Sequence, residues 1–241
     1  MKPLPAGPCR RALTVSGATL ALAFGFMHLP AAAQVAPSSS EIAAYTGLHV
    51  AAHQGDVATV TRLAKASAHA LAQTDGNGRT PLHVATFARQ RSAVAALMDA
   101  GANPATLDKD RYDAVTIAAV ADDEETLRVL LAKGASARLV TSRYDGTALI
   151  AAAHLGHDGV VRQLIAAGAP LDHVNNLHWT ALIEAIVLGD GGARHQRVVR
   201  DLLAAGANTQ LKDRQGETPL QLARSRDFAA MEKLLVSAGA R

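Results

Sequence analysis

Glu184 is the residue whose chemical type is least expected for its surroundings. Glu184 lies in a six-residue pattern that occurs six times in the chain. The matching position in the other five copies is apolar, namely Val50, Val84, Ile117, Ala151 and Leu222. A carboxylate in such a slot needs a partner, or its pKa rises until it holds its proton. Arg194 and His195, in the Gly-rich segment that follows, could supply that partner. We expect a structural pair that pins this segment. A pocket for a small ligand or metal, or a catalytic group, built around Glu184, Asp190 and His195 is the open alternative.

The other potentially reactive residues favour structural roles. His154 and His157 have an i, i+3 spacing that a metal could use, but no third ligand lies nearby in the sequence. The acidic run 122–125 suits the start of a helix, where negative charge is favourable. The Gly-rich segment 189–192 lacks the Gly-Lys-Ser/Thr ending of a phosphate-binding loop. We therefore expect a protein that is not an enzyme and has no cofactor and no metal.

One hexapeptide pattern recurs along the chain at nearly constant spacing. Its clearest copy is Thr80-Pro81-Leu82-His83-Val84-Ala85, and the six copies begin at residues 46, 80, 113, 147, 180 and 218, in steps of 34, 33, 34, 33 and 38. Each copy predicts the first of two short helices, with Thr (Asp113 in the third copy) as N-cap and, where present, Pro as the first helical residue. A second helix with an apolar stripe follows and ends at a Gly-Ala pair such as Gly101-Ala102. Such repetition predicts units that stack into a continuous core.

The repeated Thr-Pro-Leu-His-x-Ala pattern resembles the ankyrin-repeat family over about residues 42–241. The resemblance implies an all-α solenoid of about six helix-turn-helix repeats joined by β-hairpin-like turns, in a domain spanning 41–241. The repeats are expected near residues 42–75, 76–108, 109–142, 143–175, 176–213 and 214–241. The family pattern also implies that His49 and His83 make structural hydrogen bonds that tie one repeat to the next.

Repeat 5 departs from the common length. Between Ala185 and Val198 it has five residues more than repeat 4, and we expect the segment 188–196 to lengthen the turn between its two helices. The glycines of this segment would serve a turn with unusual backbone angles. The stretch 179–192 is similar to a variant repeat of exported bacterial ankyrin proteins. We assign Asp190 and His195, with Glu184, structural polar roles.

The first 33 residues are typical of an export signal. Lys2, Arg10 and Arg11 precede a mostly apolar run, and a cut is expected after Ala33, followed by a linker over 34–40. A retained membrane anchor is the alternative. Removal of the signal would change 24 basic and 21 acidic residues to 21 of each and would remove Cys9, the only cysteine. We therefore expect a periplasmic or secreted protein that binds neither nucleic acid nor, once the signal is removed, membrane.

The resemblance implies that the concave face of the stack, built from hairpin tips and first helices, binds a protein partner. Aromatic and Arg side chains dominate such interfaces. The candidate partner-binding residues on this face are Arg79, Phe87, Tyr112, Tyr144, Leu177, Trp179 and Arg214. Packing of Trp179 in the core is an alternative for that residue. We expect a monomer that acts as a general interaction module, or else as an assembly or protection factor for one periplasmic enzyme.

Overall fold

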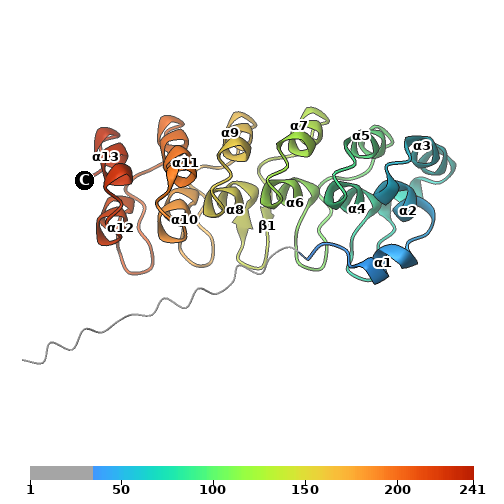
Figure 1. Ribbon diagram of the computed structural model, residues 1–241, viewed down its shortest axis with the longest axis horizontal. Helices are drawn as coiled ribbons and strands as arrows, with labels where there is room; N and C mark the ends of the chain where they lie inside the picture. The colour runs from blue at the N-terminus through green and yellow to red at the C-terminus, as the bar shows by residue number, and fades with distance from the viewer. Residues whose placement is uncertain (1–34) are drawn as a thin grey trace, which may run out of the picture. The chain divides into compact units, whose positions relative to one another are not determined.

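The structure is a computed structural model that describes residues 35–241. The predicted signal, with its cut after Ala33, lies outside the described residues. The described part is a stack of two-helix repeats, in which the first helices form one row and the second helices form another (Figure 1). The row of first helices contains α2 (Gly47–Gln54), α4 (Pro81–Phe87), α6 (Ala114–Val120), α8 (Ala148–His154), α10 (Ala181–Val187) and α12 (Pro219–Ser225). The row of second helices contains α3 (Val57–Ala66), α5 (Arg91–Asp99), α7 (Glu124–Ala132), α9 (Asp158–Ala166), α11 (Ala193–Ala204) and α13 (Ala229–Ser237). The predicted solenoid of six helical repeats is confirmed.

The core lies between the two rows and runs unbroken through the stack. The Ala that ends each hexapeptide is buried in all six repeats, which lets neighbouring first helices pack closely. Leucines and isoleucines of both rows fill the remaining space, among them Leu82, Leu97, Ile117, Leu130 and Leu149. Truncating one such side chain to Ala would cost about 2–5 kcal/mol. Because each repeat buries its apolar faces mainly against its neighbours, the stack is stable only as a row.

The helix starts and ends follow the predicted pattern. Thr80 caps α4 in a reciprocal capping box, in which its hydroxyl accepts from the His83 N–H and its own N–H donates to His83 Nδ1. Thr218 forms the same capping box with Gln221, whereas the hydroxyls of Thr147 and Thr180 each accept from the backbone N–H three residues later. Gly101, directly after the second helix of repeat 2, has φ +92°, the left-handed conformation that its position requires.

The hairpin tips between repeats are built by one repeated Asx turn. In four tips a carboxylate or amide oxygen accepts from the backbone N–H groups two and four residues later, and the acceptors are Asp75, Asp108, Asn175 and Asp213. Ser142 takes this place before repeat 4. That tip contains the strands β1 (Val140–Thr141) and β2 (Gly146–Thr147), which pair antiparallel with Val140 opposite Thr147. The expected hairpin-like turns are therefore present.

Two further short helices stand beside the first repeat. A short helix, α1 (Ser39–Ala44), begins inside the predicted linker 34–40 because Ser38 and Glu41 form a capping box there. A 3-10 helix, η1 (Ala68–Ala72), follows α3, where repeat 1 lacks the terminal Gly-Ala pair.

The repeat 5 insertion was predicted to be a longer turn, and most of it is helix instead. Helix α11 has 12 residues, three more than the 9 of α9. The turn 188–192 is two residues longer than the turn 155–157. Arg194, His195 and Gln196 therefore lie on the first turn of α11. Gly191, with φ +70°, sits against the ring of Phe228, where a side chain would not fit.

Candidate functional site

The family histidines tie neighbouring repeats together as the resemblance implied. The Nε2 atom of His49 lies 2.9 Å from the Arg79 carbonyl oxygen, and that of His83 lies 3.1 Å from the Tyr112 carbonyl oxygen. Because Nδ1 of His83 accepts from the Thr80 N–H, the proton of the neutral ring is on Nε2, which donates to Tyr112. Burial lowers the pKa of His83, which keeps the ring neutral.

Four of the candidate binding residues form a row on neighbouring hairpin tips. Tyr112, Tyr144 and Trp179 are half-buried, and Arg214 on the next tip is exposed. The tips are joined in sequence by hydrogen bonds, such as that from the Asn176 N–H to the Tyr144 carbonyl at 3.0 Å. Trp179 packs partly against the core, so the core-packing alternative holds for part of its surface.

The same face continues onto the ends of the first helices. Leu155 and Leu188 follow α8 and α10 at equivalent positions, and their exposed fractions are 37% and 38%. Leu177 and Phe87 are half-buried. We call the set Tyr112, Tyr144, Leu155, Leu177, Trp179, Leu188 and Arg214 the hairpin face. It combines aromatic and aliphatic surface with an Arg at one end.

Arg79 was predicted as a partner-binding residue, but its side chain is not accessible in the chain as described. Its side chain is buried because its own N-terminal segment covers it. Nη2 donates to the Val35 carbonyl at 2.6 Å, and Nη1 lies 3.1 Å from a Glu41 oxygen. The guanidinium carbon also lies 5.6 Å from the centre of the Phe87 ring. Residues outside the repeats supply these partners, so the repeat pattern alone could not reveal them.

Glu184 is buried as predicted, but its expected partners were wrong. Its Oε1 accepts from Asn175 Nδ2 at 2.9 Å, and its Oε2 lies 3.4 Å from Nδ1 of His154. Arg194 and His195 do not reach it because both sit on helix α11. Burial raises the pKa of Glu184 to about 7, and the Asn175 hydrogen bond opposes this rise only in part. The carboxyl group therefore gains or loses its proton near neutrality.

His154 also favours its neutral form. Burial lowers its pKa, and the nearby His195 and His157 lower it further. Since burial shifts both groups towards their neutral forms, the 3.4 Å contact lacks the mutual stabilisation of charge that a strong ion pair has. A strong ion pair would instead have lowered the pKa of Glu184 and raised that of His154.

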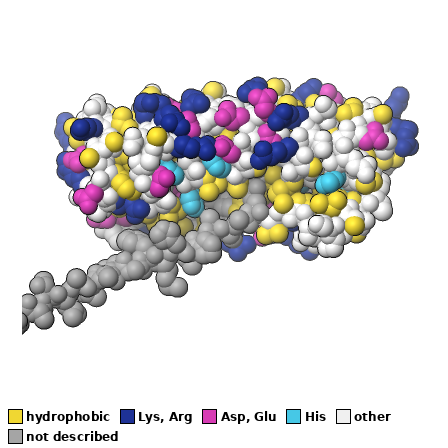
Figure 2. Space-filling view, in the orientation of Figure 1, with side chains coloured by type: hydrophobic (Ala, Val, Ile, Leu, Met, Phe, Trp, Pro, Cys, Tyr) yellow, Lys and Arg dark blue, Asp and Glu magenta, His cyan; other side chains and the backbone are white. Residues whose placement is uncertain are grey.

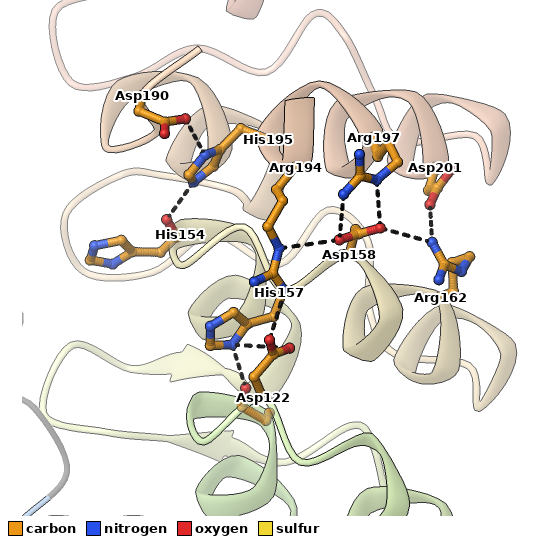
Figure 3. Close-up of polar contacts among 11 residues, drawn as sticks. Asp122, His154, His157, Asp158, Arg162, Asp190, Arg194, His195, Arg197 and Asp201 are labelled. Carbon is orange, nitrogen blue, oxygen red and sulfur yellow. Dashed lines mark hydrogen bonds and ion pairs between the residues drawn. The ribbon is translucent and has the colours of Figure 1, made fainter. Parts of the chain in front are cut away.

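A second charged cluster surrounds Asp158 at the start of α9 (Figure 3). Its carboxylate accepts from Arg197 Nε at 2.7 Å, from Arg162 Nη1 at 3.2 Å and from Arg194 Nε at 3.4 Å. The Arg197 hydrogen bond, followed by that of Arg162, holds the pKa of Asp158 far below its usual range. Arg194 also reaches Asp122 in repeat 3 at 2.7 Å. The cluster therefore connects three consecutive repeats.

Asp190 and His195 form a separate contact, which joins the turn 188–192 to the first turn of α11 (Figure 3). Asp190 Oδ1 lies 2.8 Å from Nδ1 of His195, whose Nε2 donates to the His154 carbonyl at 2.9 Å. Both residues thus hold the turn to repeat 4, which agrees with a structural role. Residues 35–241 contain no group of three acidic, His or Cys side chains placed to hold a metal ion.

The charged and apolar side chains occupy different zones. Figure 2 shows Lys and Arg side chains alternating with Asp and Glu along the upper half, over the second helices, while hydrophobic and His side chains lie in the middle of this view.

Sequence reasoning missed the roles of Asp158, Arg162, Arg197 and Asn175. In the described part of the chain, no helix is both long and apolar enough to cross a membrane.

Comparison with known proteins places these features in context. A family model described as "Ankyrin repeats (3 copies)" matches residues 34–108 and 115–213. The chain is 37% identical over 192 residues to the ankyrin repeat protein YahD of Escherichia coli K12, covering 79% of this chain and 94% of that one. It is similar to a crystal structure of an ankyrin repeat domain from Acinetobacter baumannii AYE, with a TM-score of 0.75 and 43% identity over 80% of this chain and 98% of the other. The ankyrin repeat domain of Bcl-3 aligns with a TM-score of 0.73 and 31% identity, covering 82% of this chain and 88% of that domain.

Proposed function

This chain belongs to the ankyrin-repeat family, and we propose that it binds a protein partner through its hairpin face. Ankyrin repeats are generally protein–protein interaction modules and are typically not enzymes. The proposal adds to that general function a particular surface, which lies on repeats 3 to 6.

The observation that carries the proposal is the repetition of accessible apolar surface at equivalent positions of adjacent repeats. Leu155 and Leu188 are each more than one third exposed, directly after two helices that pack side by side. The half-buried rings of Tyr112, Tyr144 and Trp179 continue this surface along the hairpin tips. Large aromatic side chains that are already partly held in place bury much area at low entropic cost when a partner binds.

The chemistry of the face indicates what kind of partner surface it fits. Its centre is apolar, and charged pairs such as Arg143 with Asp110 at 3.0 Å and Arg111 with Asp145 at 3.2 Å border it. Because these rim charges are already paired, they would contribute to orientation more than to affinity. We therefore propose a partner segment with one or two large apolar side chains flanked by polar residues.

The test combines crosslinking in intact cells with four single variants. We expect Trp179→Ala, Tyr112→Ala and Leu188→Ser to weaken the captured complex by about 1–3 kcal/mol each while the helical circular dichroism signal stays unchanged. Val57→Ser is the matched control, since Val57 is 38% exposed on a second helix, outside the hairpin face. Equal capture by all four variants would contradict the proposed surface. A single captured enzyme would favour the assembly-factor alternative over a general module.

We also propose that this binding takes place in the periplasm or outside the cell. The proposal rests on the sequence of residues 1–33 alone. N-terminal sequencing of the protein isolated from its cells should give Gln34 as the first residue. A protein that still begins at Met1 in a membrane fraction would instead support the retained anchor.

A further inference from the structure

Residues outside the repeats cover Arg79, which distinguishes it from Tyr112 and Trp179 at the equivalent position of other repeats. The residue directly before the N-cap of each first helix is Tyr45, Arg79, Tyr112, Gly146, Trp179 or Glu217. Tyr112 and Trp179 keep part of their surface accessible, whereas Arg79 is 2% exposed. Its partners include residues 35 and 41, which lie outside the repeat pattern.

The covering segment binds through polar contacts and not through a core of its own. Helix α1 has no buried residue. One Glu41 oxygen, Oε2, accepts from Ser38 within the capping box, and the other, Oε1, accepts from Arg79 and from Asn77 at the hairpin tip. Figure 1 shows α1 lying on the hairpin side of the first repeats. A segment attached by so few groups can open without unfolding the stack.

The contacts have the chemistry of peptide recognition. Arg79 presents one guanidinium nitrogen to a backbone carbonyl and another to a carboxylate, and Asn77 adds an amide donor to the same carboxylate. A carboxylate oxygen of Asp75 also lies 3.5 Å from Nη1 of Arg79, and the Phe87 ring packs against the guanidinium group. The Nε atom of Arg79 is buried without a hydrogen-bond partner among the described residues.

We propose that Asn77, Arg79 and Phe87 form a peptide-binding subsite that residues 35–41 occupy in cis as a displaceable strap. The segment that it accepts is an extended stretch leading into a helix whose first turn carries a carboxylate. Val35 supplies the carbonyl and Glu41 the carboxylate in this chain. The subsite extends the proposed hairpin face towards repeat 2 and rests on that proposed function, because a partner with the same chemistry would compete with the strap.

The cis arrangement makes the strap effective although its contacts are few. A tethered segment acts at a high effective concentration, so a free peptide of equal chemistry competes poorly until the tethered copy is weakened. Replacing the strap carboxylate should therefore open the subsite to a peptide added in trans, while leaving the guanidinium in place.

The test uses the full chain and a fluorescein-labelled synthetic peptide with the sequence of residues 34–46. We expect this peptide to bind the Glu41→Ala chain at least about tenfold more tightly than the unmodified chain. A peptide carrying the Glu41→Gln change should bind neither the Glu41→Ala chain nor the unmodified chain. Adding Arg79→Gln to the Glu41→Ala chain should abolish binding, and circular dichroism would verify that this double variant is folded. Glu125→Ala, at an exposed carboxyl group on α7, is the matched control and should behave as the unmodified chain.

Hydrogen exchange provides the second measurement. Backbone amides of residues 41–45 should exchange faster in the Glu41→Ala chain than in the Glu125→Ala chain. Faster exchange without peptide binding, or unchanged exchange at these amides, would overturn the proposal. Loss of the peptide effect with partner capture intact would remove the subsite and leave the hairpin-face function standing. Peptide binding to the Glu41→Ala chain without a captured partner would support the subsite and contradict the hairpin-face function.

Discussion

Two junctions in the same stack are held together by different chemistry. Between repeats 2 and 3, a neutral His83 donates to the Tyr112 carbonyl, and Thr80 caps the helix that carries it. Between repeats 4 and 5, the buried Glu184 contacts His154, and Asp158 binds Arg194 and Arg197 of the next repeat. The first junction keeps the repeated pattern, and the second departs from it.

The difference shows what happens when a repeat changes its length. Extending α11 adds a helical turn that carries Arg194 and His195, and their polar groups need partners in repeats 3 and 4. Charged contacts are then present at this junction in addition to a side-chain-to-backbone bond, from His195 to the His154 carbonyl. We therefore expect the junction between repeats 4 and 5 to respond to pH and salt, and the junction between repeats 2 and 3 to respond little near neutrality.

The largest expected effect comes from replacing Glu184 by Gln. The pKa of Glu184 is raised from 4.5 to about 7 in the folded chain. Its stabilising contribution is therefore complete below pH 4.5 and is lost as the pH rises through 7. At pH 8, Glu184→Gln should raise the free energy of unfolding by on the order of 3 kcal/mol, while at pH 4.5 the variant and the unmodified chain should be similar. Urea unfolding at both pH values measures this.

Two features make that comparison specific. The lowered pKa of His154 gives the opposite trend, since its contribution is lost as the pH falls, and the difference between the variant and the unmodified chain isolates Glu184. Glu125→Gln removes an exposed carboxyl group whose pKa is lowered, so its effect should differ much less between pH 4.5 and pH 8 than that of Glu184→Gln. If Glu184→Gln has the same effect on stability at both pH values, the junction is not pH-sensitive.

A smaller effect is expected at Asp158. The Asp158→Asn change removes the charge that three arginines share, and we expect a loss of about 2 kcal/mol at low salt. Because those arginines are 40–54% exposed, 1 M NaCl should reduce the loss. Asp201→Asn is the control with fewer partners, since among residues 35–241 Asp201 pairs with Arg162 and Arg200. Equal losses for both variants would mean that Asp158 is not the centre of the cluster.

The regular junction should lose less and should be insensitive to solution conditions. Thr80→Ala removes the N-cap of α4 and should cost about 1 kcal/mol. This cost should be the same at pH 7 and pH 9 and in low and high salt, because neither partner is charged there. The exposed Thr74→Ala change is the control and should stay within about 0.5 kcal/mol. A salt-dependent cost at Thr80 would erase the contrast between the two junctions.

The repeat architecture could be predicted because each unit carries its own local signals. The N-caps of the first helices, the small Ala that ends each hexapeptide and the glycine after the second helices of repeats 2 to 6 all depend on residues close in sequence. The repeat period then fixes which units are neighbours. These signals placed Tyr112, Tyr144 and Trp179 on adjacent tips without any long-range information.

The polar partners required information that local signals do not hold. The partner of Glu184 depended on whether residues 193–196 form turn or helix, and a helix carries Arg194 away from the carboxyl group. Arg79 depended on a segment that precedes the repeats. The Asp158 cluster could have been anticipated, since its Arg194 and Arg197 partners lie 36 and 39 residues away, about one repeat period, as in the pairs Arg143–Asp110 and Lys133–Asp99. In a solenoid, opposite charges about one repeat period apart are therefore first expected to form structural ion pairs.

The smallest expected effect tests the two arginines that the sequence placed in one class. Arg214 is exposed and, within the described part of the chain, donates a single hydrogen bond, to the Asn176 carbonyl at 2.8 Å, so Arg214→Ala should change the free energy of unfolding by no more than about 0.5 kcal/mol. Arg79→Ala should cost more, because it removes a buried group with several charged partners. Urea unfolding of both variants gives the comparison. A large loss at Arg214 would mean that the tips of repeats 5 and 6 depend on it for their structure. With stability unchanged, any loss of partner capture by Arg214→Ala belongs to the interface itself.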